Sequence, residues 1–311
     1  MALVALAAAA PVRAQDAIRI LVGFPPGGGA DLIARLAADK ARDALGAQVI
    51  VENRPGAGGQ IAAEALKNAA PDGKTLMASP VAVTVIAPLT HKKLAYDPEK
   101  DFAPVSLAVN FQLAFTAGPG TPATTLAEYI GWVKGDARRT SFGVPAAGSL
   151  PHFFGLLLGR AIGTELVHIP YKGGAPLLND LIGGQIPAGV DVLSEAIPQH
   201  RAGKVRILAS SGARRSPIAP EVPTFTELGY PQLETVAWMG LWVKPDTPVA
   251  VQAQIREAAL KALASPSARE RLQEIGFEPP QPRTPDELSA SLKVDSERVG
   301  AILKSIGFKP E

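Results

Sequence analysis

The amino-acid sequence predicts an α/β protein with two lobes, each a mainly parallel sheet flanked by helices. Three observations lead to this prediction. The order strand, small-residue loop, helix opens the chain and returns near residue 141. Two long extended runs, 102–116 and 236–243, separate these regions, and the chain after the second run has the pattern of helices. Because the chain crosses between the lobes twice, we expect a hinge with a cleft beside it.

The first strand–loop–helix unit contains the longest glycine run of the chain. The apolar segment Ile18–Val22 predicts a buried strand, and helical spacing of apolar residues begins at Leu32 and continues to Leu45. Between them, glycines 27–29 leave no side chains between the backbone and a ligand. The free N–H groups of the helix start favour an anion there. An ordinary strand-to-helix turn is the alternative, and Asp31 is expected to cap the helix.

Repeated strand–helix units extend this lobe and then form the second one. We expect further strands at 48–51, 75–78, 141–144, 166–169, 189–193 and 205–209, and helices at 32–45, 61–69, 151–160 and 175–182. Strands about thirty residues apart are typical of βαβ units. Thr125 and Glu128 have the spacing of a capping box. After residue 243 we expect three helices and no new strand, with Thr247, Ser265 and Thr284 each capping a helix that begins with proline.

Composition excludes several classes of function. The chain has 311 residues, a net charge of +2 and no cysteine. We therefore predict no nucleic-acid surface, no thiol catalysis and no iron–sulfur site.

Residues 1–15 contain the apolar run 3–10 and the small-residue site Val12-Arg13-Ala14. This pattern predicts an export signal cleaved after Ala14, and a periplasmic location for the mature protein.

Catalytic motifs do not emerge from the sequence. The four histidines lack metal-binding spacing, and the segment 148–151 lacks the second glycine of a nucleophile elbow. We predict no cofactor, no metal and no enzymatic activity. His152, in the first turn of a predicted helix, is either satisfied by the backbone or donates to a bound carboxylate, and both interpretations stay open. A small-molecule hydrolase or transferase that uses Ser149 and His152 is the alternative function.

Several sequence blocks together resemble the Bug-type receptors, which are extracytoplasmic solute-binding proteins of tripartite tricarboxylate transporters. These blocks are Val22-Gly23-Phe24-Pro25-Pro26-Gly27-Gly28, Val51-Glu52-Asn53-Arg54-Pro55-Gly56-Ala57-Gly58-Gly59, Pro71-Asp72-Gly73-Lys74-Thr75-Leu76, His168-Ile169-Pro170-Tyr171-Lys172-Gly173-Gly174-Ala175-Pro176, Ala202-Gly203-Lys204, Glu221-Val222-Pro223-Thr224, Glu227-Leu228-Gly229-Tyr230 and Trp238-Met239-Gly240-Leu241. They occur in order over nearly all of the mature chain.

The resemblance implies a Venus-flytrap receptor with the type II binding-protein topology, and a small carboxylate as its ligand. The carboxylate would be a di- or tricarboxylate, an acidic amino acid or an aromatic acid. By position, the implied ligand contacts are Phe24, Pro25, Gly27, Gly28 and Ser79 from the first lobe, and Ala147, Gly148, Ser149, His152, Tyr171 and Asp191 from the second. The permease subunits of a tripartite transporter, or a signalling protein, would be its partner. The receptor itself would be a monomer.

Two departures from the family pattern lie close to the implied ligand. Ala87 stands where relatives often have asparagine, and 144–147 replaces a run richer in serine and glycine. The substrate of a relative therefore does not transfer to this chain.

We expect the first lobe to comprise residues 16–112 and 237–311, and the second lobe residues 113–236.

Overall fold

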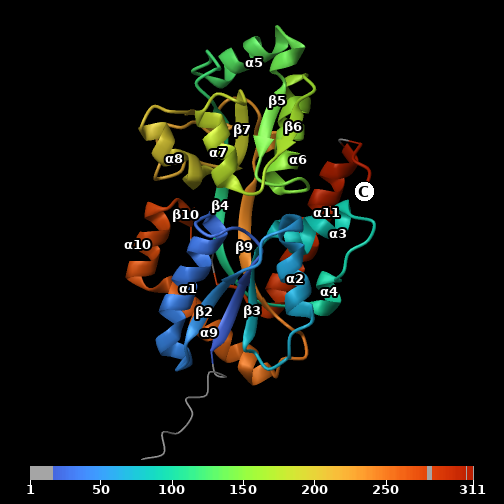
Figure 1. The fold of residues 1–311 in the computed structure, drawn as a ribbon, viewed down its shortest axis with the longest axis vertical. Helices are drawn as coiled ribbons and strands as arrows, with labels where there is room; N and C mark the ends of the chain where they lie inside the picture. Colours follow the sequence, from blue (N-terminus) through green and yellow to red (C-terminus); the bar gives the residue numbers. More distant parts are fainter. Residues whose placement is uncertain (1–16, 279–281, 306, 311) are drawn as a thin grey trace, which may run out of the picture.

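The protein has two α/β lobes stacked along its long axis (Figure 1). The computed structural model describes residues 17–278, 282–305 and 307–310. One continuous path of strands, in the order β2-β1-β3-β9-β4-β7-β5-β6, runs through both lobes. Two further strands, β8 and β10, pair with β4 beside this path. The predicted fold class is confirmed, and the predicted export signal lies outside the described residues.

Parallel strands form the centre of the first lobe. Strand β1 pairs in parallel with β2 on one side and with β3 on the other. The elements of this region are β1 (Ile18–Val22), α1 (Gly29–Leu45), β2 (Val49–Asn53), α2 (Gln60–Lys67), β3 (Thr75–Pro80), the π-helical turn 82–86, α3 (Ala87–Thr90) and α4 (Pro98–Asp101). Helix α1 begins three residues before the predicted start, so its first residue belongs to the glycine run. The prediction that Asp31 caps this helix is wrong, because Gly28 is the N-cap residue.

The two extended runs form long strands that connect the lobes. Strand β4 (Ala103–Ala117) and strand β9 (Val236–Val243) are antiparallel to each other, and β9 also pairs with β3. Beyond its pairing with β9, β4 continues antiparallel to β7 and β8. Figure 1 shows both strands passing from the lower lobe to the upper one. A single strand therefore contributes to the sheets of both lobes.

The second lobe repeats the strand–helix pattern of the first. Its parallel strands β6 and β7 flank β5. The elements are α5 (Leu126–Lys134), β5 (Ser141–Val144), α6 (Leu150–Ile162), β6 (Val167–Pro170), α7 (Gly174–Ile182), β7 (Ala188–Val192), α8 (Leu193–Arg201) and β8 (Arg206–Ser210). The predicted capping box is confirmed, since the Thr125 hydroxyl accepts from the Glu128 N–H and the Glu128 carboxylate accepts from the Thr125 N–H.

The C-terminal region returns to the first lobe and contains one strand that the sequence did not predict. Its elements are α9 (Val249–Ala264), α10 (Pro266–Glu274), β10 (Phe277–Glu278) and α11 (Pro285–Ser305). Strand β10 pairs with β4, and the buried Phe277 ring packs on the Phe111 ring. Two residues are too few to give a strand period in the sequence. The prediction that Thr247 caps α9 is also wrong, because Pro248 is the N-cap residue and the helix begins at Val249.

The last helix connects the first lobe to the second lobe. The Trp238 indole of β9 donates to Asp295 of α11 at 2.7 Å. Beyond α11, the Phe308 ring packs edge-on against the Phe153 ring of α6, with 5.2 Å between ring centres. The C-terminal segment is therefore a third contact between the lobes, beside the two long strands. Within the described ranges, no helix has the length and apolar character needed to cross a membrane.

Candidate functional site

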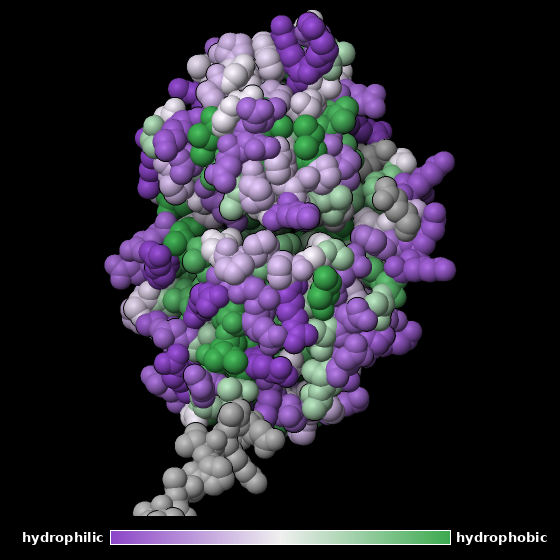
Figure 2. All heavy atoms as spheres, in the orientation of Figure 1, coloured by the Kyte–Doolittle hydropathy of each residue, from purple (hydrophilic) through white to green (hydrophobic). Residues whose placement is uncertain are grey.

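Two neighbouring cavities lie between the lobes, where the loops of small residues meet. The larger has a volume of about 690 Å³ and the smaller about 130 Å³. Phe24 and Pro25 of the first lobe, and Ala146, Ser149 and Gly173 of the second, line both of them. Figure 2 shows the groove between the two halves of the molecule on this face. A ligand in either cavity would touch both lobes.

The first-lobe wall depends on the backbone geometry of the glycine run. Gly27 has a φ of +87°, which an L-residue with a side chain rarely adopts. Gly28 has φ −78° and ψ 168°, and as N-cap residue it offers no side chain to the helix start. A Cβ added to Gly28 would meet no atom closer than 3.8 Å. The space in front of Gly28 is therefore open to the smaller cavity that it lines.

Asp31 holds this loop in place. Its buried carboxylate accepts hydrogen bonds from the Gly27 N–H, the Arg35 guanidinium and the Asn53 amide, each at 2.9 Å. Burial alone raises the pKa of Asp31, but these hydrogen bonds and the charge of Arg35 outweigh it and leave the pKa below its usual value. Asn53 also donates to the Phe24 carbonyl. The role of Asp31 is therefore structural, as expected. It holds the glycine loop through the Gly27 N–H instead of capping the helix.

The second-lobe wall is the loop between β5 and α6. Ser149 is the N-cap residue of α6, and its hydroxyl donates to the Ala146 carbonyl at 2.7 Å. Gly148, with φ +70°, donates its N–H to Nδ1 of His152 at 3.1 Å. The His152 ring is buried, and its centre lies 3.8 Å from the centre of the His168 ring. His152 is therefore satisfied locally by the backbone, which favours the first of its two interpretations.

Burial, and then the nearby His168, lower the pKa of His152 to about 4. The folded protein thus keeps this ring neutral, while the unfolded chain binds its proton near pH 6.5. Below that pH the unfolded state holds more protons, so we expect stability to fall between about pH 6.5 and pH 4. At pH 5 the expected loss is about 1–2 kcal/mol relative to pH 7.5.

Urea unfolding of the wild type and of His152→Gln over this pH range measures the effect. The variant should show a smaller loss of stability on acidification. An equal loss in the two proteins would assign the acid sensitivity to other groups.

The predicted site residues fall into three groups. Phe24, Pro25, Gly28, Ser149 and Asp191 line the smaller cavity, and Phe24, Pro25, Ala147, Gly148, Ser149 and Tyr171 line the larger. Gly27, Ser79 and His152 line neither. The Ser79 hydroxyl donates to the neighbouring Pro80 carbonyl, and the Tyr171 hydroxyl donates to Asp180. Contact of any of them with a ligand stays a prediction.

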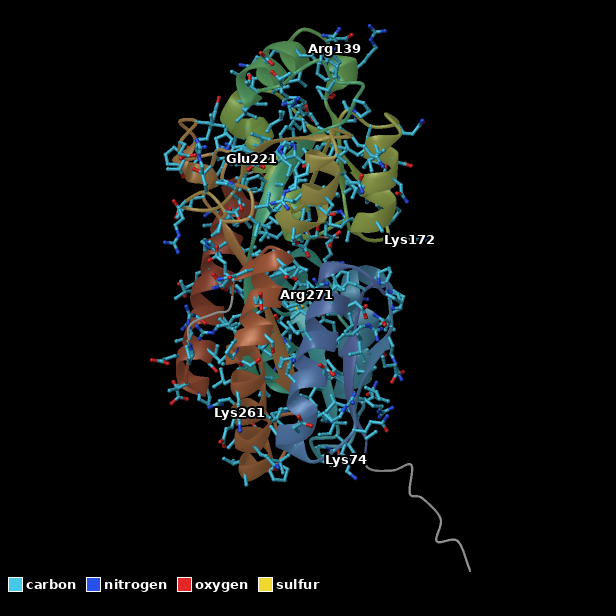
Figure 3. The ribbon with its side chains drawn as sticks, turned by 90° about the vertical axis from the view of Figure 1, so that its left-hand side faces the viewer. Lys74, Arg139, Lys172, Glu221, Lys261 and Arg271 are labelled. Atoms are coloured by element: carbon cyan, nitrogen blue, oxygen red, sulfur yellow. The ribbon has the colours of Figure 1, made fainter. Side chains whose placement is uncertain are left out.

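Among the other lining residues, the sequence did not predict Glu195, Phe111, Met239 and Phe277. Glu195 of α8 lines the smaller cavity beside Asp191, and Phe111, Met239 and Phe277 form much of its apolar wall. Lys172 lines both cavities, and Figure 3 shows it at the edge of the second lobe that faces the first. The aromatic and methionine side chains come from β4, β9 and β10. Only the three-dimensional fold brings those strands to this position.

Comparison with known proteins gives a consistent set of relatives. Residues 33–308 match the family described as tripartite tricarboxylate transporter family receptor. The solved structure of periplasmic binding protein BugD is 31% identical, covers 96% of this chain and 99% of its own, and superposes with a TM-score of 0.90.

Two solved structures with bound ligands are also similar to this chain. MatC from Rhodopseudomonas palustris, with bound malate, is 32% identical, with 92% of this chain and 98% of its own covered and a TM-score of 0.86. Another R. palustris protein, with adipate, is 29% identical. The match covers 96% of this chain and 100% of that protein, with a TM-score of 0.91.

Proposed function

Because this chain belongs to the tripartite tricarboxylate transporter receptor family, we propose that it captures a small carboxylate between its two lobes. The observation that carries the proposal is the pair of cavities walled by a strand–loop–helix start from each lobe. Such helix starts carry the positive end of a helix dipole, which favours an anion nearby. Relatives with bound malate and adipate support the carboxylate class.

A thermal-shift screen followed by calorimetry tests this proposal. Malate, adipate, succinate, amino acids and pyridine carboxylates form one set of compounds, and neutral sugars form the other. At least one carboxylate should raise Tm and bind with a measurable heat. Stabilisation by neutral sugars alone would contradict the proposal.

Ligand binding in this protein is proposed to close the lobes. A compound that touches both cavity walls binds the closed state better than the open one, so it shifts the population toward closure. We also propose that the lobes divide at residues 112/113 and 236/237. The pairing of β4 supports this division, since Gln112 pairs with Val236 of β9 and Leu113 pairs with Val192 of β7. Small-angle scattering with and without a bound carboxylate would measure the closure.

We propose that the protein is a receptor without catalytic activity. A serine nucleophile requires a base within hydrogen-bond reach of its hydroxyl. Here the Ser149 hydroxyl donates to Ala146, and Nδ1 of His152 accepts from the Gly148 backbone. This arrangement favours a structural loop over the hydrolase or transferase alternative. Turnover of small esters or amides by purified protein would contradict it.

Export to the periplasm is proposed from the N-terminal sequence and from the family. We expect the mature protein to begin at Gln15, after cleavage following Ala14. N-terminal sequencing of protein from a periplasmic extract measures this directly, and an intact Met1 would count against it. A monomeric receptor that delivers its ligand to the permease subunits of a tripartite transporter, or to a signalling partner, completes the proposal.

A further inference from the structure

A carboxylate of the protein itself occupies the start of helix α1. Glu195 lies on α8 of the second lobe, and its Oε1 accepts a hydrogen bond from the Gly29 N–H at 3.1 Å. Gly29 is the first residue of α1 in the first lobe. An anion at this position is stabilised by the helix start, and Glu195 already supplies that anion. The same hydrogen bond also joins the two lobes.

Asp191 places a second carboxyl group beside the first. Its Oδ1 accepts from the Val192 N–H at 2.8 Å. A Cβ built on Gly174 would collide with Oδ2 of Asp191 and with Oε2 of Glu195 alike, so these two oxygens are close neighbours. Burial raises the pKa of both groups, and the adjacent charge of Glu195 raises that of Asp191 further. Two ionised carboxylates this close repel each other, so one of them holds a proton unless a cation is present.

No counter-charge from the described residues forms an ion pair with Asp191 or Glu195. Within the part of the chain that the structure describes, no lysine, arginine or histidine forms a salt bridge with Asp191 or Glu195. Lys172 lines the same cavity but makes no such pair. The described residues also contain no group of three or more carboxylates and histidines suited to a metal ion. In the protein without ligand, a shared proton satisfies this pair, and a cationic group of a ligand would take the place of that proton.

The cavity that contains this acid pair, formed by Asp191 and Glu195, is otherwise largely apolar. Ile33, Val81, Phe111, Met239 and Phe277 contribute to its wall. The larger cavity, which contains the Ala147–Ser149 loop, lies directly beside it and contains no carboxylate. A ligand that spans both cavities would thus meet an anion-favouring helix start at one end and two acids at the other.

We propose that Asp191 and Glu195 form a subsite for a cationic nitrogen, so that the ligand is an amino-carboxylate rather than a simple dicarboxylate. The proposal rests on the carboxylate-receptor function proposed above and narrows its substrate class. The ligand carboxylate lies toward the α6 start, and its ammonium donates to the acid pair. A second ligand carboxylate at the α1 start would face Glu195. The two negative charges would repel each other strongly because the closed cavity excludes water. The acid pair thus selects for one ligand class and against the other.

Matched compounds test the selection. Calorimetry compares aspartate, leucine and phenylalanine with their analogues that lack the amino group, namely succinate, 4-methylpentanoate and 3-phenylpropionate, and with malate and adipate. At least one amino acid should bind about tenfold or more tightly than its analogue. If the wild type binds a dicarboxylate, or an analogue without the amino group, more tightly than the amino acids, the cationic subsite is overturned and the receptor function stays intact. If neither group of compounds binds, the receptor function itself fails.

Variants assign the selection to the acid pair. Glu195→Gln keeps an acceptor for the Gly29 N–H while it removes the charge. Asp191→Asn likewise removes the charge and keeps an acceptor for the Val192 N–H. Each should cut the preference for the amino acid about tenfold or more. Glu221→Gln is the control, because Glu221 lies on the other side of the second lobe from Lys172 (Figure 3) and lines neither cavity. Melting curves confirm that the variants fold, and unchanged preference in both folded variants would overturn the proposal.

Discussion

Replacing Gly155 with alanine is expected to lower the free energy of unfolding by about 2–3 kcal/mol, whereas the same replacement at Gly131 should raise it by up to about 1 kcal/mol. Both glycines lie inside helices of the second lobe, α6 and α5. A Cβ on Gly155 would collide with the ring of Phe142, which is fully buried and cannot move aside. A Cβ on Gly131 would meet nothing within 4 Å.

The comparison isolates packing from helix propensity. Alanine favours a helix over glycine by roughly 0.5–1 kcal/mol at either position, so the opposite sign at Gly155 measures the collision with Phe142. Urea unfolding followed by circular dichroism gives both values. A Gly155→Ala protein as stable as the wild type would show that α6 shifts away from β5 at little cost.

Replacing Gly28 with valine is expected to weaken carboxylate binding at least about a hundredfold, which corresponds to about 2.8 kcal/mol. The side chain would project into the smaller cavity beside Glu195, whose Oε1 lies 3.9 Å from the position of the new Cβ. The φ of Gly28 is −78°, so the substitution adds no left-handed strain. We expect a change in stability below about 1 kcal/mol, as for other non-polar N-cap residues.

The measurement uses the carboxylate that raises the wild-type Tm most in the thermal-shift screen. Gly120→Val is the matched control, because Gly120 is exposed in the turn that follows β4 and an added Cβ meets only one atom within 4 Å. The control should bind as the wild type does. Equal affinity in Gly28→Val would show that the glycine run is only a turn.

Three strands were predictable because short segments rich in apolar residues are followed closely by glycine or proline. Segments 18–22, 141–144 and 236–243 form strands with the predicted bounds. The start of α1 was not predictable, because glycines in sequence indicate a loop. In the folded protein, Asp31 binds back to the Gly27 N–H and Glu195 receives the Gly29 N–H. The second of these contacts joins residues 166 positions apart, beyond the reach of any local sequence pattern.

The site was predictable where it follows the loops, and not where it depends on side-chain packing. Phe24, Pro25, Gly28 and Ser149 line the smaller cavity because parallel strands bring loops to one edge of a sheet. Glu195 gave no signal of its own, since a glutamate at the start of a helix is usually exposed. His152 has the right sequence position, but its ring packs on His168 and Phe153, so burial decides its role.

The ring contact between Phe308 and Phe153 constrains how the receptor can open. Strands β4 and β9 run side by side, so alone they would act as one flexible pivot that permits bending, twisting and lateral swing. The aromatic contact holds the second lobe at a separate point, and a rigid body fixed at two separate points rotates only about the line between them. While the rings stay in contact, we expect opening to be a single rotation. Interlobe distances from paired spin labels would then vary along one coordinate. Their independent variation would mean that the rings part, and that the lobes have more than one open geometry.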